Sequence, residues 1–301
     1  MRGCYYVCMI YAIVGPTGSG KTSLACEVAS RFNLPIINAD AFQIYQEMNI
    51  GTAKISKNDP LYKNHYIIDV INPSQTYSVK QYRDDFDKVI FNLLKNNKDV
   101  IICGGTGLYL RAALYDYSFP EQEEIDTSKY DSLSVEELYE RLKELDPESA
   151  SKIHPNNKKR VIRALIIAEN SDLTKSENIA SQEHKMRFDD VEILFLNPNR
   201  DELYQTINNR VDQMFDNGLV EEVKALLKKY EFSLTAYQAI GYKEVIDYLN
   251  GETALEECKE LIKKRTRNYA KRQVTFFKHQ FETLEFNNKK DLLTYLFDKI
   301  K

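Results

Sequence analysis

A glycine-rich stretch near the start of the chain constrains the fold more than any other feature of the sequence. Residues 15–22 read GPTGSGKT, which fits the pattern G-x-x-x-x-G-K-[ST] of a phosphate-binding loop. The apolar run at 9–14 predicts a buried parallel strand before the loop, and the apolar spacing of 22–32 predicts a helix after it. In such a loop the backbone N–H groups converge on an anion at the positive end of the helix. The sequence therefore predicts an α/β protein with a phosphate cradle at its first strand.

Every residue of this loop is a candidate phosphate contact: Gly15, Pro16, Thr17, Gly18, Ser19, Gly20, Lys21 and Thr22. Lys21 adds a mobile positive charge, and the Thr22 hydroxyl can bind a magnesium ion that the phosphates also hold. The loop alone does not identify the phosphorylated molecule or the reaction.

Length and composition describe an ordinary globular protein of about two domains. The 301 residues are 43% hydrophobic and 29% charged, with no run long enough to span a membrane. The cysteines have neither the spacing of a zinc site nor that of a disulfide framework, so we expect reduced thiols in the cytoplasm. We also expect a monomer without membrane contact. A net charge of −4 means that a nucleic-acid partner would need local positive patches.

Strand and helix patterns alternate through the first part of the chain. Residues 36–40 and 99–103 predict buried strands, and a capping box at Ser78 and Gln81 predicts the start of a helix between them. The second of these strands runs directly into the glycine-rich residues 104–107, where the backbone can approach a ligand closely. Repeated strand–helix–strand units favour a parallel sheet.

The pattern changes between residues 119 and 188, where we expect a mostly helical insertion. A second capping box, at Ser134 and Glu137, predicts one of its helices, and another is expected from about 157 to 169. Strand character returns at 191–196.

The expected architecture is thus an α/β core of the P-loop NTPase type, with a parallel sheet, formed by residues 1–118 and 189–301. The segment 119–188 is the helical insertion. From residue 200 onward we expect only helices, and Thr253 is expected to cap the last long one.

The carboxylates limit the possible reactions. Most phosphate-loop hydrolases need an acidic residue at the end of a neighbouring strand to hold magnesium and orient water, but the strand at 99–103 ends in glycines. Asp40 and Asp69, each at the end of a short apolar run, are the other candidates. This pattern argues against a motor-type ATPase and leaves a small-molecule kinase open.

Two clusters of basic residues predict contacts with a polyanion. Residues 261–281 hold Lys and Arg without any acidic residue and with aromatic residues between them. A second cluster lies on the expected insertion helix, with Arg160 and Arg163 on one face. A solvated helix face would explain either cluster alone. Two separate patches suit a large curved polyanion better than a small metabolite.

With these motifs the chain resembles the bacterial-type tRNA dimethylallyltransferases, the P-loop isopentenyltransferase family. The motifs are GPTGSGKT at 15–22, NADAFQIYQEMNIGTAK at 38–54, GGTGLYL at 104–110, DPESASKIHPNN at 146–157, KRVIRAL at 159–165, YQAIGYKE at 237–244 and TRNYAKRQVTFFK at 266–278. The resemblance implies transfer of a dimethylallyl group from dimethylallyl diphosphate to the exocyclic N6 amine of the adenosine just 3′ of a tRNA anticodon. It also implies Mg²⁺ as cofactor and the anticodon stem-loop as partner.

The resemblance also implies roles for individual residues. Asp40 would be the base that takes the amine proton, Thr106 would lie beside the reacting groups, and Arg210 would hold the diphosphate together with residues 15–22. The implied tRNA contacts are Asp40, Ala41, Phe42, Gln43, Thr106, Lys159, Arg160, Val161, Ile162, Arg163, Gln238, Gly241, Tyr242, Lys243, Arg267, Lys271 and Arg272.

Several positions depart from the family pattern. Ala41 stands where serine is usual, Asn157 where aspartate is, Ile166 where glutamate is, Thr206 where arginine is, and Phe276 or Phe277 where tryptophan is. Three other functions stay open: a small-molecule kinase, a transferase that prenylates free AMP, and a non-catalytic RNA-binding protein.

Overall fold

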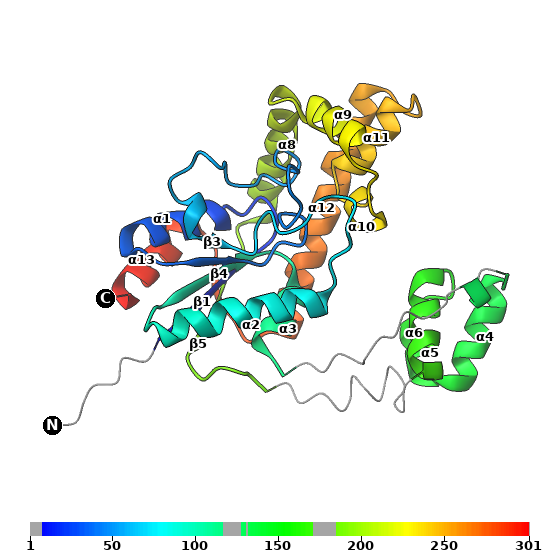
Figure 1. Cartoon of the computed structure of the whole chain (residues 1–301), viewed down its shortest axis with the longest axis horizontal. Helices are drawn as coiled ribbons and strands as arrows, with labels where there is room; N and C mark the ends of the chain where they lie inside the picture. Colours follow the sequence, from blue (N-terminus) through cyan, green and yellow to red (C-terminus); the bar gives the residue numbers. More distant parts are fainter. Residues whose placement is uncertain (1–7, 117–127, 131, 171–184, 301) are drawn as a thin grey trace. The chain divides into compact units, whose positions relative to one another are not determined.

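A computed structural model describes residues 8–116, 128–130, 132–170 and 185–300. At its centre is a six-stranded sheet with the strand order β3-β2-β4-β1-β5-β6 (Figure 1). The strands are β1 Ile10–Val14, β2 Ile36–Asn38, β3 His65–Tyr66, β4 Val100–Gly104, β5 Val191–Leu196 and β6 Leu284–Phe286. Every neighbouring pair is parallel, which confirms the predicted sheet.

Helices cover both faces of the sheet. On one face α1 (Lys21–Phe32) and α13 (Lys289–Lys299) pack on alternate residues of β1, β4 and β5. On the other, α2 (Val79–Lys95) buries its aromatic side, and Tyr82 stacks on Tyr109 of α3 (Gly107–Leu114). Because β1 and β4 run parallel, the loops that follow them lie at the same edge of the sheet.

The remaining core helices follow β5 and lie together beyond one edge of the sheet (Figure 1). They are α8 (Arg200–Asp216), α9 (Leu219–Lys229), α10 (Leu234–Tyr237), α11 (Tyr242–Leu249) and α12 (Leu255–Gln280). Helix α12 packs along α8 and α11. This arrangement brings residues from the last third of the sequence to the loops that follow the first strands.

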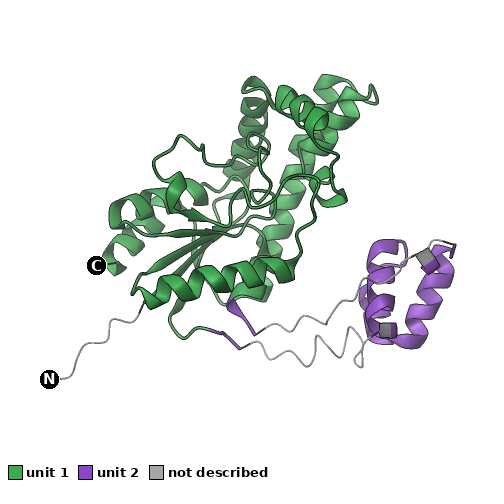
Figure 2. Ribbon diagram, in the orientation of Figure 1, with its two compact units in different colours: residues 1–113, 188–301 green, residues 114–187 purple. Residues whose placement is uncertain are grey.

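The chain divides into two compact units, residues 1–113 with 188–301, and residues 114–187 (Figure 2). The second unit contains α4 (Val135–Leu145), α5 (Pro147–Lys152) and α6 (Lys158–Asn170) around a core of its own that includes Leu138, Leu142, Val161 and Leu165. The boundary expected between 118 and 119 lies outside the described residues.

Local sequence signals explain most helix starts. Both predicted capping boxes are present, since the Ser78 and Ser134 hydroxyls each accept a hydrogen bond from the backbone three residues on. The cap predicted at Thr253 is wrong: the N-cap of α12 is Ala254, which has no side chain able to cap. The expectation of helices alone after residue 200 is also wrong, because β6 extends the sheet beside β5. None of the described helices has both the length and the apolar character needed to cross a membrane.

Candidate active site

The phosphate loop joins β1 to α1, as the sequence predicts, and its lysine is held inside the protein. Lys21 is 8% exposed, and its Nζ donates a hydrogen bond to the Pro16 carbonyl at 3.2 Å. Burial lowers the pKa of Lys21, while nearby Cys103 and Asp40 favour its charged form. The Ser19 hydroxyl is buried and has no partner within the described part of the chain. The loop thus presents a desolvated cation and an unused donor where an anion would bind.

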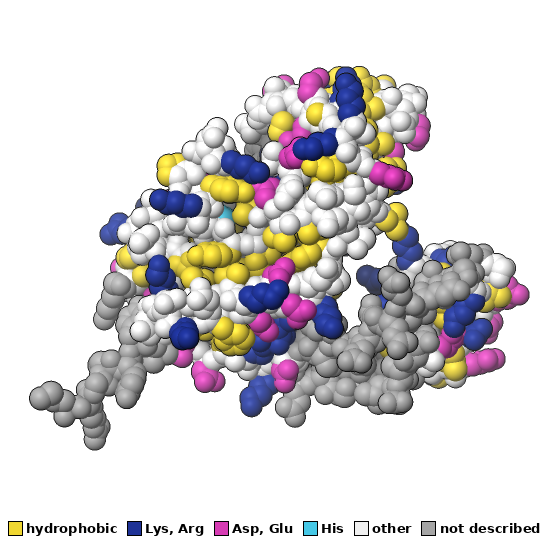
Figure 3. Space-filling model, in the orientation of Figure 1, with side chains coloured by type: hydrophobic (Ala, Val, Ile, Leu, Met, Phe, Trp, Pro, Cys, Tyr) yellow, Lys and Arg dark blue, Asp and Glu magenta, His cyan; other side chains and the backbone are white. Residues whose placement is uncertain are grey.

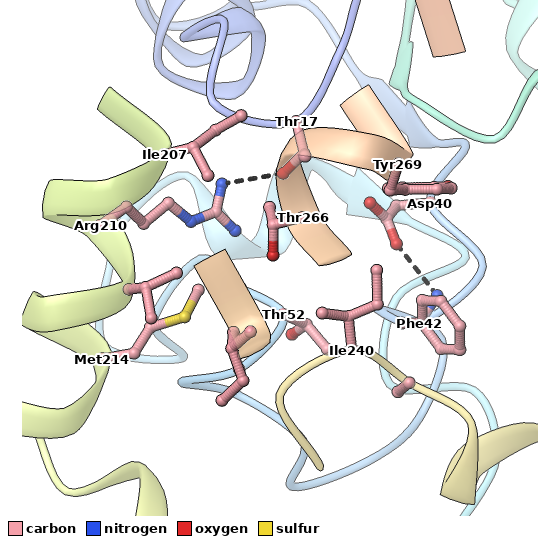
Figure 4. A pocket seen from close by; sticks show the side chains of 14 residues that line it. Thr17, Asp40, Phe42, Thr52, Ile207, Arg210, Met214, Ile240, Thr266 and Tyr269 are labelled. Carbon is pink, nitrogen blue, oxygen red and sulfur yellow. Dashed lines mark hydrogen bonds between the residues drawn. The ribbon is translucent and has the colours of Figure 1, made fainter. Parts of the chain in front are cut away.

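Arg210 adds a second cation from α8. Its Nη1 donates a hydrogen bond to the Thr17 hydroxyl at 3.3 Å, and Figure 4 shows the guanidinium pointing toward the loop. The Nε atom is buried without a hydrogen-bond partner among the described residues. Burial lowers the pKa of Arg210, and Asp40 opposes that shift. Because a buried guanidinium with an unused donor is costly, its position indicates an anion site at the loop.

Two cavities meet at Arg210 and Met214, which line both of them. We call them the loop cavity and the inner cavity. Basic side chains border the loop cavity, namely Lys21, Lys54, Lys57 and Arg210, and Thr22 lies there too. The inner cavity has an apolar wall formed by Ile207, Val211, Met214, Ile240 and Ile262, and its polar members include Thr17, Asp40 and Tyr269 (Figure 4). An anion site therefore borders an apolar space whose lining includes a carboxylate.

Asp40 follows β2 and is oriented by its neighbours. Its backbone N–H and carbonyl both bond the side-chain amide of Asn38, each at 3.1 Å. Its Oδ1 accepts a hydrogen bond from the Phe42 N–H at 3.0 Å, while the other carboxylate oxygen points into the inner cavity (Figure 4). Asp40 therefore caps the segment after it and still offers one oxygen to a ligand.

Thr106 joins the loop after β4 to the segment of Asp40. Its backbone N–H donates to the Ala39 carbonyl and its hydroxyl accepts from the Ala41 N–H, both at 3.0 Å. Tyr269 of α12 lies close by in the cavity wall. Burial, with a contribution from Asp40, raises the pKa of Tyr269 to about 12, and hydrogen bonds with Thr106 and Gln273 oppose that rise. The structure thus brings together Asp40, Thr106 and a phenol that the sequence did not point to.

Asp69, the other candidate carboxylate, is used elsewhere. It forms an ion pair with Lys54 at 2.7 Å and accepts a hydrogen bond from Tyr62. Burial alone would raise its pKa, but these hydrogen bonds outweigh burial and lower it. Gln43 likewise supports the local chain, because its amide donates to the Thr52 carbonyl at 3.1 Å. Both oxygens of Asp69 are therefore engaged away from the inner cavity, whereas the tRNA contact expected of Gln43 stays a prediction.

The expected tRNA contacts of the core unit fall into two groups. Gln238, Lys271 and Arg272 are exposed and Lys243 is half-buried, as a surface contact requires. Gly241 and Tyr242 are buried, and the tRNA contacts expected of them stay predictions. The Tyr242 hydroxyl donates to Glu222 at 2.6 Å, and that carboxylate also accepts from the Asn49 and Ile50 N–H groups. Arg267 is half-buried and donates to Asn208 on α8.

In the second unit, α6 presents a basic surface. Lys159, Arg160 and Arg163 are exposed and Ile162 is half-buried. Val161 is fully buried in the core of that unit, and the tRNA contact expected of it stays a prediction. On the face of the core unit drawn in Figure 3, basic and acidic side chains are interspersed.

Sequence reasoning missed Asn38, Gln273 and the apolar wall of the inner cavity. For Gln273 a signal existed: it shares the buried side of α12 with Ala270 and Phe277 at helical spacing. A polar residue on an apolar helix face must find buried partners, and Gln273 has them in Thr17 and Gly105.

Comparison with known proteins adds a family to this geometry. A family model described as IPP transferase matches residues 43–280. The tRNA dimethylallyltransferase of Caldanaerobacter subterraneus subsp. tengcongensis is 44% identical over 278 residues, covering 89% of this chain and 88% of the relative.

Solved structures agree. A tRNA isopentenylpyrophosphate transferase from Staphylococcus epidermidis superposes with a TM-score of 0.69 at 36% identity and covers 97% of this chain and 98% of its own. A eukaryotic dimethylallyltransferase acting on tRNA superposes with a TM-score of 0.81 at 28% identity, covering 97% of this chain and 79% of its own.

Proposed function

The chain belongs to the IPP transferase family, and from that premise we propose that it transfers a dimethylallyl group from dimethylallyl diphosphate to a tRNA. The acceptor is the exocyclic N6 amine of the adenosine just 3′ of the anticodon, and diphosphate is released. One observation carries the proposal: an anion site made by the phosphate loop and Arg210 borders an apolar cavity whose lining includes Asp40 (Figure 4). A phosphorylated isoprenoid likewise joins a charged diphosphate to an apolar hydrocarbon chain.

The loop serves departure of the diphosphate. As the allylic C–O bond breaks, its electron pair goes to the diphosphate oxygen, and negative charge there increases. Lys21, the loop N–H groups and Arg210 are donors already fixed in a desolvated site, so they stabilise that charge without reorganising. The unpartnered Ser19 hydroxyl and Arg210 Nε are the donors that the diphosphate would satisfy.

The other half of the site serves the amine. Attack of N6 on the allylic carbon forms the new C–N bond, and N6 then loses one proton. Asp40, with one oxygen held by the Phe42 N–H and the other directed into the cavity, takes that proton. The adenine must leave its stack to reach the cavity, so the stem-loop is gripped outside it while the base is inserted.

Magnesium fits this site as a partner of the substrate. Among the described residues no cluster of three or more acidic, histidine or cysteine side chains could bind a metal without help. We propose that the Thr22 hydroxyl would help to hold Mg²⁺, which would neutralise charge on the diphosphate leaving group.

The exposed basic residues of α6, with Lys271 and Arg272 of α12, provide the proposed contacts with the tRNA backbone. We further propose that the protein works as a monomer in the cytoplasm.

The test is a direct assay of prenyl transfer. Purified protein is incubated with dimethylallyl diphosphate, Mg²⁺ and an unmodified anticodon stem-loop with adenosine 3′ of the anticodon. We expect prenyl-adenosine in the nuclease digest and one diphosphate released per prenyl group. A stem-loop with guanosine at that position is the matched control, and AMP is offered as a separate acceptor. Product from AMP alone, or no product from either acceptor, contradicts the proposal.

A further inference from the structure

Gln273 has no role in the proposed chemistry, yet it bonds the loops that follow β1 and β4. It lies on α12, it is 6% exposed, and it is not among the residues that line either cavity. Its Oε1 accepts a hydrogen bond from the Thr17 N–H at 2.8 Å, and its Nε2 donates to the Gly105 carbonyl at 2.8 Å. One side chain thus holds the phosphate loop with one atom and the loop after β4 with the other.

The backbone at Gly105 lies so close to Gln273 that a side chain there would displace the carboxamide. A Cβ atom there would lie 2.3 Å from Gln273 Nε2, far inside van der Waals contact. Two residues further on, a Cβ at Gly107 would lie 2.2 Å from the Phe276 ring. The glycine-rich turn at 104–107 is therefore fitted against α12, and Gln273 makes the polar contact in that fit.

Each segment that Gln273 holds carries one half of the reaction. Thr17 accepts a hydrogen bond from Arg210, so its position sets that of the cation beside the diphosphate. Gly105 is followed by Thr106, which accepts from the Ala41 N–H next to Asp40. Gln273 also opposes the rise in the pKa of Tyr269, which lines the inner cavity.

We infer that Gln273 is a positioning residue, which fixes the diphosphate half of the site relative to the amine half by bonding both with its neutral carboxamide. The inference rests on the proposed function. A carboxamide suits this role because one of its ends accepts and the other donates, as Thr17 and Gly105 require. A carboxylate at the same place would accept at both ends and leave the Gly105 carbonyl facing a negative oxygen.

The first test separates positioning from binding. Gln273→Met keeps the size of the side chain and removes the hydrogen bonds to Thr17 and Gly105. Each substrate should still bind, because the residues that contact it are unchanged. We expect kcat for prenyl transfer to fall by about tenfold or more while KM for dimethylallyl diphosphate changes by less than about threefold. Gln205→Met, at an exposed position on α8, is the matched control and keeps the wild-type kcat.

The second test uses charge. In Gln273→Glu the introduced carboxyl, when protonated, can again donate to Gly105 and accept from Thr17. Burial raises the pKa of such a group, so the protonated form gains population as pH falls. The kcat of Gln273→Glu divided by that of wild type at the same pH should therefore rise toward acid pH, whereas the same ratio for Gln273→Met stays flat.

The outcomes are distinct. Three results would each overturn the positioning role while leaving the proposed function intact. They are a wild-type kcat in Gln273→Met, a rise in its KM for dimethylallyl diphosphate as large as the fall in kcat, and a relative kcat of Gln273→Glu that does not change with pH. No product from wild type overturns the proposed function and this role together. Should Gln273→Met fail to fold, as judged by its unfolding transition, the pH dependence of Gln273→Glu decides alone.

Discussion

The Thr106 hydroxyl accepts a hydrogen bond from the backbone N–H of Ala41, across two loops that are 65 residues apart in sequence. Through this bond the loop after β4 fixes the backbone adjoining Asp40. Thr106 also opposes the rise in the pKa of Tyr269, which lines the inner cavity. Thr106 therefore acts on the geometry of the proposed base as well as on the cavity.

Thr106→Val should lower kcat by about tenfold or more, because the Ala41 N–H loses its acceptor and the Asp40 segment relaxes. Thr106→Ser restores the hydroxyl and should recover most of the lost rate. Steady-state prenyl transfer to the stem-loop measures both. Equal rates for the valine and serine variants would contradict the role of the hydroxyl.

Asp40→Asn should reduce kcat by about a hundredfold or more and leave tRNA binding unchanged. The amide can still accept from the Phe42 N–H, so the segment keeps its shape, but it cannot take the N6 proton. Single-turnover kinetics and stem-loop binding are measured on the same preparation. Asp298→Asn, at an exposed position on α13, is the control. Loss of binding with normal turnover would refute the base.

Arg210→Met should weaken binding of dimethylallyl diphosphate by roughly ten- to a hundredfold, as expected for loss of hydrogen bonds to a charged group. Arg210→Lys keeps the charge without the planar fork, so its affinity should fall between the two. Titration calorimetry gives the dissociation constants, with Arg200→Met at the exposed start of α8 as the control. Wild-type affinity in Arg210→Met would place the anion elsewhere.

Replacing Lys159, Arg160 and Arg163 together by alanine should reduce the dependence of stem-loop affinity on salt. The slope of log K against log salt should become shallower by about 2 to 3, since each phosphate contact contributes somewhat less than one. Lys143→Ala with Lys152→Ala, on α4 and α5 of the same unit, is the control because both lysines are paired with glutamates. An unchanged slope for the triple variant would remove α6 from the tRNA interface.

Tyr242→Phe should lower the free energy of unfolding by about 1–3 kcal/mol, because the Glu222 carboxylate loses a buried donor. Urea denaturation measures the change, and Tyr248→Phe on the same helix is the control. Stem-loop affinity of the folded variant should equal that of wild type, since the Tyr242 ring is buried. Weaker stem-loop binding at unchanged stability would support a direct contact between Tyr242 and tRNA.

The features that were predicted best from the sequence are those that depend only on residues close together in the chain. The phosphate loop, the capping box at Ser78 and the buried strand at 191–196 each depend on neighbouring residues, and each is found in the structure. β6 was missed because only three residues pair there, and their partner strand lies about 90 residues earlier in the chain. A strand that short has no periodicity to read.

Within the site, a residue's chemical type was easier to predict than its surroundings. Arg210 lies against the loop as a diphosphate contact requires, whereas Tyr242 and Val161 belong to motifs but have buried side chains. A motif does not say which of its members face outward. The role inferred for Gln273 depends on partners 256 and 168 residues away, which only the fold brings to it.

The bond between Thr17 and Gln273 also sets an order for the synthesis of the protein. A ribosome completes the phosphate cradle and Asp40 when most of the chain is still unmade, but the residue that joins the two loops arrives only with α12. Until that helix has emerged and packed, the nascent chain carries the motifs without a joined site, since contacts so distant in sequence form late. The joined site therefore depends on α12, although the phosphate loop and Asp40 lie far earlier in the sequence.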